Sequence, residues 1–258
     1  MTKRNIVRVC LTVMLFFATL GIMTNQAMTS SKELDLVLIT DRDVYHVGQP
    51  VRLTMEVHNV SKETIIGAFG LSLSDFKLRI YYRRVGEQFE KYSCGAQEHP
   101  VGIALPTKLL PGEASSGIAV IVFDTNKKRL VLDKAGEYEF KVVYRDKRGE
   151  QIEEIESNIV RVKVTPIPAG EEAAFKLYAD EGVARLAQGD SIYYNWEYNN
   201  AIKSALLLAE SYPLSIYTDY LSNGQLPQLN QVITSPYVSD DQMRLHNMLR
   251  KPTKENLE

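Results

Sequence analysis

Residues 41–59 constrain this chain most, because they combine a tight turn with a strand that has one apolar face. Val51, Leu53, Met55 and Val57 alternate with polar residues, a period of two that is typical of a half-buried strand. Gly48 and Pro50 precede this strand. Glycine permits a sharp turn and proline is tolerated at the first residue of a strand. The pattern predicts the opening of an antiparallel β-sandwich.

Similar short segments, separated by turn signals, continue to residue 165. In the clearest of them Tyr138, Phe140, Val142 and Tyr144 are expected to face inward, and the charged residues Glu137, Glu139, Lys141 and Arg145 outward, which again indicates one buried face. Residues 93–110 show no period and are expected to form the longest irregular connection. The spacing of these segments is that of an all-β sandwich over residues 34–168.

The hydrophobic period changes after Pro166 and Pro168. Residues 171–188 have apolar positions at helical spacing and Gly189 is suited to end that helix, so a first helix is predicted there. A second helix is expected from about residue 196 to Pro213, and a shorter one before Asn223. The sequence therefore predicts a small all-α helical hairpin over residues 170–224. Residues 225–258 are expected to be an irregular tail, with a short helix conceivable at residues 240–250.

Residues 1–27 have the pattern of a secretory signal peptide. Lys3, Arg4 and Arg8 are followed by an uncharged, largely apolar run and then by Ala27, a small residue suited to cleavage. The apolar run is shorter than the ~20 residues that cross a bilayer, which favours cleavage over a retained anchor. We therefore expect an extracytoplasmic protein, periplasmic, in the cell envelope or secreted, that meets a membrane only through this segment if it stays uncleaved.

The charge of the chain argues against nucleic acid as a partner. The formal net charge is -2, and the first 27 residues contribute positive charge only, so the remainder is more acidic still. A nucleic-acid-binding surface needs a basic field that neutralises phosphates. A protein is the expected partner, and the oligomeric state stays open.

Residues 40–59, with the sequence TDRDVYHVGQPVRLTMEVHN, resemble the opening of the macroglobulin-type immunoglobulin-like domains of the alpha-2-macroglobulin family. They are also similar to the immunoglobulin-like fold of bacterial proteinase inhibitors. LLPGE, AGEYEFKVVY and SNIVRVKVTP follow in the order seen in many exported bacterial proteins of unknown function. The resemblance implies an immunoglobulin-like sandwich over residues 34–168 and implies no activity, because these are turn and core positions.

The helical segment resembles one tetratricopeptide repeat. Tyr178, Gly182 and Gly189 match its first helix and turn, while Tyr198, Ala201 and Pro213 fit its second helix if residues 191–197 are an insertion. Stacked arrays need about three repeats to bury a core, so a single repeat implies packing on the sandwich.

No catalytic, cofactor-binding or metal-binding constellation stands out in the sequence. The four histidines are scattered, and no phosphate loop or nucleophile elbow is present. Asp41, Asp43 and Asp124 are interpreted as turn residues rather than as a calcium cluster. Cys94 is the only cysteine after residue 27, so it has no intramolecular partner there, and we interpret it as a tolerated loop cysteine whose reactivity stays open.

One local density of aromatic residues is unusual. Tyr193, Tyr194, Trp196 and Tyr198 crowd the turn of the predicted hairpin. Such residues dominate binding hot spots, but they also fill contacts between domains. We interpret the group as a candidate interdomain or binding surface, with interdomain packing preferred.

Together these observations predict a non-catalytic, extracytoplasmic protein-interaction module without a cofactor. Two alternatives remain: a binding domain similar to a proteinase inhibitor, and a hydrolase whose active site forms only in three dimensions. An enzyme would show a concave pocket with a pair of titrating groups.

If residues 1–27 are a cleaved signal, the exported protein begins near Met28. N-terminal sequencing of the exported chain measures this directly. An exported chain that still starts at Met1 would contradict the predicted cleavage.

Overall fold

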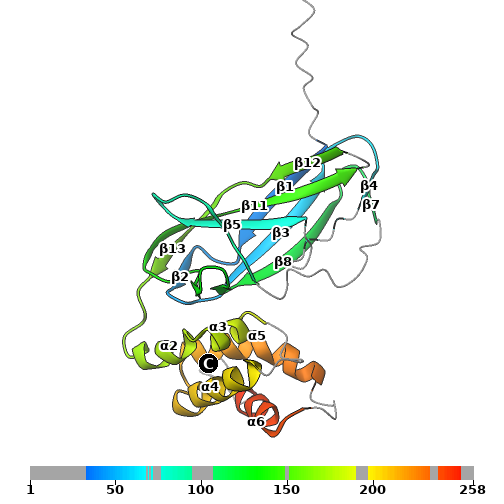
Figure 1. Cartoon of the computed structure of the whole chain (residues 1–258). Helices are drawn as coiled ribbons and strands as arrows, with labels where there is room; N and C mark the ends of the chain where they lie inside the picture. Colours follow the sequence, from blue (N-terminus) through cyan, green and yellow to red (C-terminus); the bar gives the residue numbers. More distant parts are fainter. Residues whose placement is uncertain are drawn as a thin grey trace, which may run out of the picture. The chain divides into compact units, whose positions relative to one another are not determined.

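The computed structural model describes residues 33–67, 69, 71, 77–94, 107–148, 151–189, 197–232 and 238–250. The chain from Leu34 onward forms one compact unit. Its strands end at Thr165 and its helices begin at Glu172 (Figure 1). The change from strand to helix thus falls where the prolines predicted it, but the contacts do not separate strands and helices into two units.

Two main sheets make up the β part. The first is antiparallel, with β1 (Leu34–Thr40), β3 (Val51–Asn59) and β8 (Ala114–Ile121) in that order. The second has the order β2-β13-β11-β5-β6, with β12 also paired to β11; its β2–β13 pair is parallel. Its strands are β2 (Val44–His46), β5 (Leu78–Arg84), β6 (Glu90–Lys91), β11 (Gly136–Arg148), β12 (Gln151–Glu156) and β13 (Val160–Thr165).

Two short strand pairs complete the β part. β4 (Ile65–Gly67) pairs with β7 (Thr107–Leu109), and β9 (Phe123–Asp124) pairs with β10 (Arg129–Leu130).

The alternating residues of β3 and β11 face a common core. Leu53 and Met55 of the first sheet and Phe140 and Val142 of the second are fully buried, and all belong to one apolar cluster. Arg52, which lies between buried neighbours on β3, is exposed. Period-two alternation therefore gives each sheet one buried face. The prediction that this part of the chain is mainly β-sheet is confirmed.

Five helices follow within the described residues. They are α2 (Glu172–Tyr178), α3 (Glu181–Ala187), α4 (Glu197–Ser211), α5 (Ile216–Val232) and α6 (Asp240–Leu249) (Figure 1). A second apolar cluster joins all five, and it also contains Val122, Phe123 and Leu130 from the β part. A helical hairpin alone does not describe this region.

The continuous helix predicted over residues 171–188 is wrong at its centre. α2 ends at Tyr178, and the Asp180 side chain accepts a hydrogen bond from Gly182 N at 3.0 Å to cap α3. Aspartate competes for backbone donors in this way and favours helix starts over helix interiors. One predicted helix is therefore two.

The irregular tail predicted from residue 225 is wrong over residues 225–232, whereas the short helix considered at residues 240–250 is present as α6. α5 runs through Asn223, Gly224 and Pro227 to Val232. α6 begins at a capping box in which Ser239 and Gln242 bond each other's backbone. Both helices contribute to the second core through Leu229 and Leu245. Tertiary burial overrides the local turn signal at Asn223–Gly224.

Glycine permits the closest contact between α3 and α5. A Cβ placed on Gly224 would lie 2.0 Å from the carbonyl oxygen of Ala187, inside the backbone of α3. The neighbouring Gln225 side chain donates a hydrogen bond to the Leu186 carbonyl. The apparent turn residue Gly224 is therefore a packing residue.

Within the described ranges, no helix combines the length and the apolar character needed to cross a bilayer.

Gly224→Ala is expected to lower the free energy of unfolding by about 1–3 kcal/mol, as overpacking does. At an exposed position inside a helix, replacing Gly by Ala would raise the free energy of unfolding by up to about 1 kcal/mol. The change expected at Gly224 therefore has the opposite sign to the one that helix propensity predicts. Urea unfolding followed by circular dichroism measures the effect. Asn223→Ala, at an exposed neighbouring position, is the control. A stabilised Gly224→Ala variant would show that the close approach of α3 and α5 is wrong.

Candidate functional site

The end of α3 is bonded to the β part through one side chain, that of Gln188. Its Oε1 accepts hydrogen bonds from the Tyr92 hydroxyl at 2.7 Å and from the backbone N–H groups of Val122 and Phe123 at 3.0 Å each. Gln188 is only 6% exposed. Three donors from the β part therefore converge on a single buried acceptor of the helical part.

A second bond fixes α5 to the turn between β2 and β3. The Tyr217 hydroxyl donates to the Val47 carbonyl at 2.9 Å, and both residues are buried. The next residue, Gly48, has φ +80°, and a Cβ there would lie 2.9 Å from the Phe175 ring. Glycine at this position thus satisfies both the turn conformation and the packing of α2 against it.

An aromatic cluster supports this contact from the helical part. The Tyr217 ring lies 5.3 Å from that of Phe175 and 5.1 Å from that of Tyr178, centroid to centroid. Burial raises the pKa of the Tyr178 hydroxyl well above its ordinary value. These rings therefore act as neutral packing groups.

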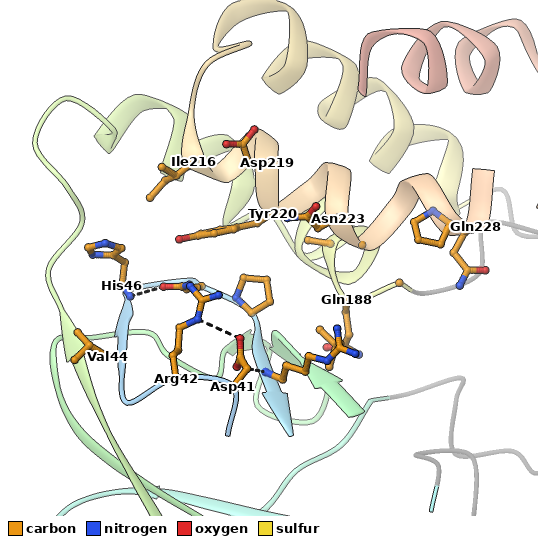
Figure 2. Close-up of a pocket in the computed structure, with 18 residues that line it drawn as sticks. Asp41, Arg42, Val44, His46, Gln188, Ile216, Asp219, Tyr220, Asn223 and Gln228 are labelled. Carbon is orange, nitrogen blue, oxygen red and sulfur yellow. Dashed lines mark hydrogen bonds and ion pairs between the residues drawn. The ribbon is translucent and has the colours of Figure 1, made fainter. Parts of the chain in front are cut away.

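A cleft of about 760 Å³ lies beside these contacts, between the end of the β part and α5 (Figure 2). This volume is within the range of ordinary ligand pockets. Its lining comes from the β1–β2 turn, β2, the start of β3, the end of α3 and one side of α5. Its polar lining includes Asp41, Arg42, His46, Arg52, Asp219 and Tyr220.

Asp41 organises the β wall of the cleft. Its Oδ1 accepts from the Tyr45 hydroxyl at 2.6 Å and from Arg52 N at 3.3 Å, and its Oδ2 accepts from Arg42 Nε at 3.1 Å. Burial, and then the bond to the Asp41 carboxylate, raise the pKa of the Tyr45 hydroxyl. The predicted turn role of Asp41 is what this geometry shows, and both of its oxygens are engaged.

His46 is held at the rim of the same wall. Its Nδ1 lies 2.7 Å from Thr165 Oγ1, which also bonds the Tyr45 carbonyl at 3.0 Å. The backbone N–H of His46 donates to Gln49 Oε1 at 2.9 Å. β2 is an end strand of its sheet, and Gln49 occupies one of the backbone donors that an added strand would need.

The helical wall carries polar groups and one aromatic ring beside apolar residues such as Ile216 and Pro227. Asp219, Tyr220 and Asn223 follow each other along α5 and border the cleft. Figure 2 shows Arg42 and Tyr220 reaching toward the same hollow from opposite walls. The cleft thus presents guanidinium groups on one side and amide, carboxylate and phenol groups on the other.

The predicted aromatic surface cannot be placed in this cleft. Tyr193, Tyr194 and Trp196 lie outside the described residues, and Tyr198 is described only as backbone of α4. The role of this aromatic surface, either in packing between the strands and helices or in binding a partner, stays a prediction.

Other candidate residues serve structural roles in the described chain. Asp124 is buried and accepts from the Tyr82 hydroxyl and from two backbone N–H groups of the following turn. Cys94 is buried in the β core. Across the parts of the chain that the structure describes, no three His, Cys, Asp or Glu residues are grouped closely enough to hold a metal ion.

Sequence reasoning missed Gln188, Tyr217 and Tyr220, which hold or line the cleft. Gln188 directly precedes the helix-ending Gly189, and the two tyrosines occur in a segment that was predicted to be a short helix. No local pattern marks any of them as a contact between strands and helices.

Neither the protein-family models nor the curated proteins include a match to this chain. Solved structures that resemble it do so weakly. A β-glucosidase from Erythrobacter marinus is 12% identical over 51% of this chain, with a TM-score of 0.30, and the match spans only 15% of the glucosidase. A CARDB domain from Pyrococcus furiosus, solved with two metal ions, is 12% identical over 51% of this chain and 87% of its own, with a TM-score of 0.28.

The sporulation control protein Spo0M from Bacillus subtilis is 15% identical over 56% of this chain and 54% of its own, with a TM-score of 0.31. Likenesses of this size assign neither a family nor an activity to the chain.

Gln188→Leu is expected to lower the free energy of unfolding by about 3 kcal/mol, because two buried backbone N–H groups and a hydroxyl lose their acceptor. Urea unfolding, read by tyrosine and tryptophan fluorescence, measures the change. The matched control is Lys176→Leu on the exposed side of α2, which should shift stability by less than about 0.5 kcal/mol. Equal stability of the two variants would show that Gln188 does not join the helices to the strands.

Proposed function

We propose that the protein is a non-catalytic, extracytoplasmic interaction module that binds another protein in the cleft between its β part and α5. The β part is an immunoglobulin-like sandwich in this proposal, and the helices are a tetratricopeptide-like extension that forms the second wall. The signal-like residues 1–27 support an extracytoplasmic location. The acidic remainder of the chain supports a protein partner over nucleic acid.

The observation that carries the proposal is the composition of the cleft. Both walls carry polar groups among apolar ones, and the polar groups Asp41, His46 and Gln49 of the β wall are bonded within the protein. A wall held in place by internal hydrogen bonds is preorganised for binding. Its donors and acceptors fit the side chains and backbone of another protein.

A hydrolase is the second candidate, and one contact favours it. The hydroxyl of Thr165 lies within hydrogen-bond distance of the His46 imidazole, which is the relation of a nucleophile to its base. The same hydroxyl also lies 3.0 Å from the Tyr45 carbonyl, in the parallel pair of β2 and β13. This second bond gives Thr165 a structural task, so binding is the preferred function.

An inhibitor of proteinases remains the alternative within binding functions. It rests on the resemblance of residues 40–59 and needs a proteinase as the partner. Its distinguishing property is loss of proteolytic activity when the chain is added.

The proposal predicts that a photo-crosslinking amino acid at Asn223 captures a defined protein from an extract of the native envelope and medium. The same group at Glu153, exposed on β12, is the control and should not capture that protein. Tyr220→Ala should reduce the Asn223 crosslink. Equal capture from both positions would contradict a binding cleft. Turnover of ester, peptide or glycoside substrates that disappears in His46→Ala would favour the hydrolase.

A further inference from the structure

We propose that the partner enters as an extended peptide segment that places a carboxylate on Arg42 and Arg52 and, two residues away, an apolar side chain on Ile39 and Ile118. This inference rests on the proposed function, because it names the chemistry of the segment that occupies the cleft. Three observations carry it: an excess of guanidinium donors, an apolar row beside them, and the spacing between the two.

The donors of the β wall exceed its acceptors. Both oxygens of Asp41 are engaged, and of the two arginines it accepts only from the Nε of Arg42 and the backbone N–H of Arg52. Within the described residues, the terminal nitrogens of Arg42 and the whole guanidinium of Arg52 form no hydrogen bond or ion pair, and both residues are exposed. Guanidinium groups bind carboxylates in pairs of parallel hydrogen bonds. The wall is therefore suited to a carboxylate.

The neighbouring carboxylates do not supply that partner. Glu56, on the same outer face of β3, is bonded to His58 at 3.0 Å. Asp219 stands on the opposite wall, on α5, and already has an interaction of its own. Asp43 adjoins Arg42 on the β1–β2 turn and is exposed. None of these three carboxylates is bonded to a guanidinium group of Arg42 or Arg52, so a carboxylate from outside can reach those nitrogens without displacing an internal partner.

An apolar row borders these arginines on the outer face of the first sheet. Ile39 and Ile118 both lie opposite Thr54 in the strand register, one on each side, so the three form a row across β1, β3 and β8. Ile39 is 46% exposed and Ile118 is 51% exposed. The two isoleucines are separated by ~10 Å, with Thr54 between them, so an apolar side chain seated over Thr54 can contact both.

The spacing of the two features selects an extended ligand. Arg52 and Thr54 are two residues apart on β3, so the row of Arg52 and the row of Thr54 are separated by about 7 Å. In an extended peptide, side chains at positions i and i+2 point the same way at this same spacing. Side chains at i and i+1 point to opposite faces and cannot reach both rows. Both rows cross the outer face of the first sheet, so recognition is through side chains rather than through an added strand.

The test uses the full-length chain on an array of acetylated, amidated ten-residue peptides. Each peptide carries one Val or Leu and one Glu in a Ser/Thr background, with the two placed at i,i+1 or i,i+2. Matched peptides replace Glu by Gln or the apolar residue by Ser. The expected result is that i,i+2 peptides with Glu bind at least tenfold more tightly than either matched peptide and than the i,i+1 set.

Two double variants locate the two halves of the surface. Arg42→Gln with Arg52→Gln should abolish the preference for Glu over Gln, while Ile39→Ser with Ile118→Ser should abolish the preference for the apolar residue. Lys163→Gln and Ile159→Ser, exposed on and next to β13, are the controls and should retain both preferences. All these positions are exposed, and unchanged urea midpoints confirm that each variant is folded.

The outcomes separate this inference from the proposed function. If the Asn223 crosslink still captures a protein but the array shows no preference for Glu, the acidic segment is wrong and the binding cleft stands. If neither experiment shows binding, both fail. Binding of the acidic polysaccharide polygalacturonate in place of every peptide, lost in the double arginine variant, would overturn the peptide and assign the arginines to an anionic glycan.

Discussion

The hydrogen bonds that converge on the Gln188 amide oxygen are the constraint on which the rest of the structure depends. After β8 the chain must turn, and Val122 and Phe123 there bury apolar side chains that belong to the helical core. Their backbone N–H groups are buried with them, and a buried donor without an acceptor costs about 1–3 kcal/mol. The acceptor comes from the residue that follows α3. The helices therefore complete the β part as well as cover it, which explains why the chain from Leu34 onward is one compact unit.

The strands were predictable because their physical cause is local. A period of two with one apolar face is enough to specify a half-buried strand, and β3 follows its alternation residue by residue. β11 buries its predicted apolar face as well, although Glu139 and Val143 on its other face are also buried. The helical part was less predictable because its causes are distant in the sequence. Asn223 and Gly224 read as a turn by local chemistry, yet they continue α5 because Gly224 lets the helix approach the backbone of Ala187. Asp180 is a good helix-capping residue, and this is visible in the sequence. Because the apolar residues around it keep helical spacing, the sequence does not show that one helix ends and another begins there.

The same distinction applies to the candidate site. The turn role of Asp41 is predicted from its position before β2. In the structure its carboxylate accepts three hydrogen bonds, from Arg42 Nε, the Tyr45 hydroxyl and the Arg52 backbone N–H. The cleft itself joins residues near position 42 to residues near position 220, and no sequence period connects them. Tyr220 and Gln188 have no pattern of their own, since a single tyrosine or glutamine is as common in packing as in binding. Clefts of this kind arise from the docking of elements, and docking is decided by the apolar residues around the cleft rather than by those inside it.

The position of the cleft follows from the two buried contacts that hold the helices. Gln188 fixes α3 to the turn after β8, and Tyr217 fixes α5 to the carbonyl of Val47. Tyr217 is on the buried side of α5, so its neighbours Ile216, Asp219 and Tyr220 are turned toward the β1–β2 turn, where Asp41 stands. Asp41 in turn engages both carboxylate oxygens with the Tyr45 hydroxyl, the Arg52 backbone N–H and Arg42 Nε. The Arg52 guanidinium and the terminal nitrogens of Arg42 therefore stay available at the surface. A residue that stabilises the β part thus also sets the polarity of the surface beside it, because its carboxylate is already occupied within the wall.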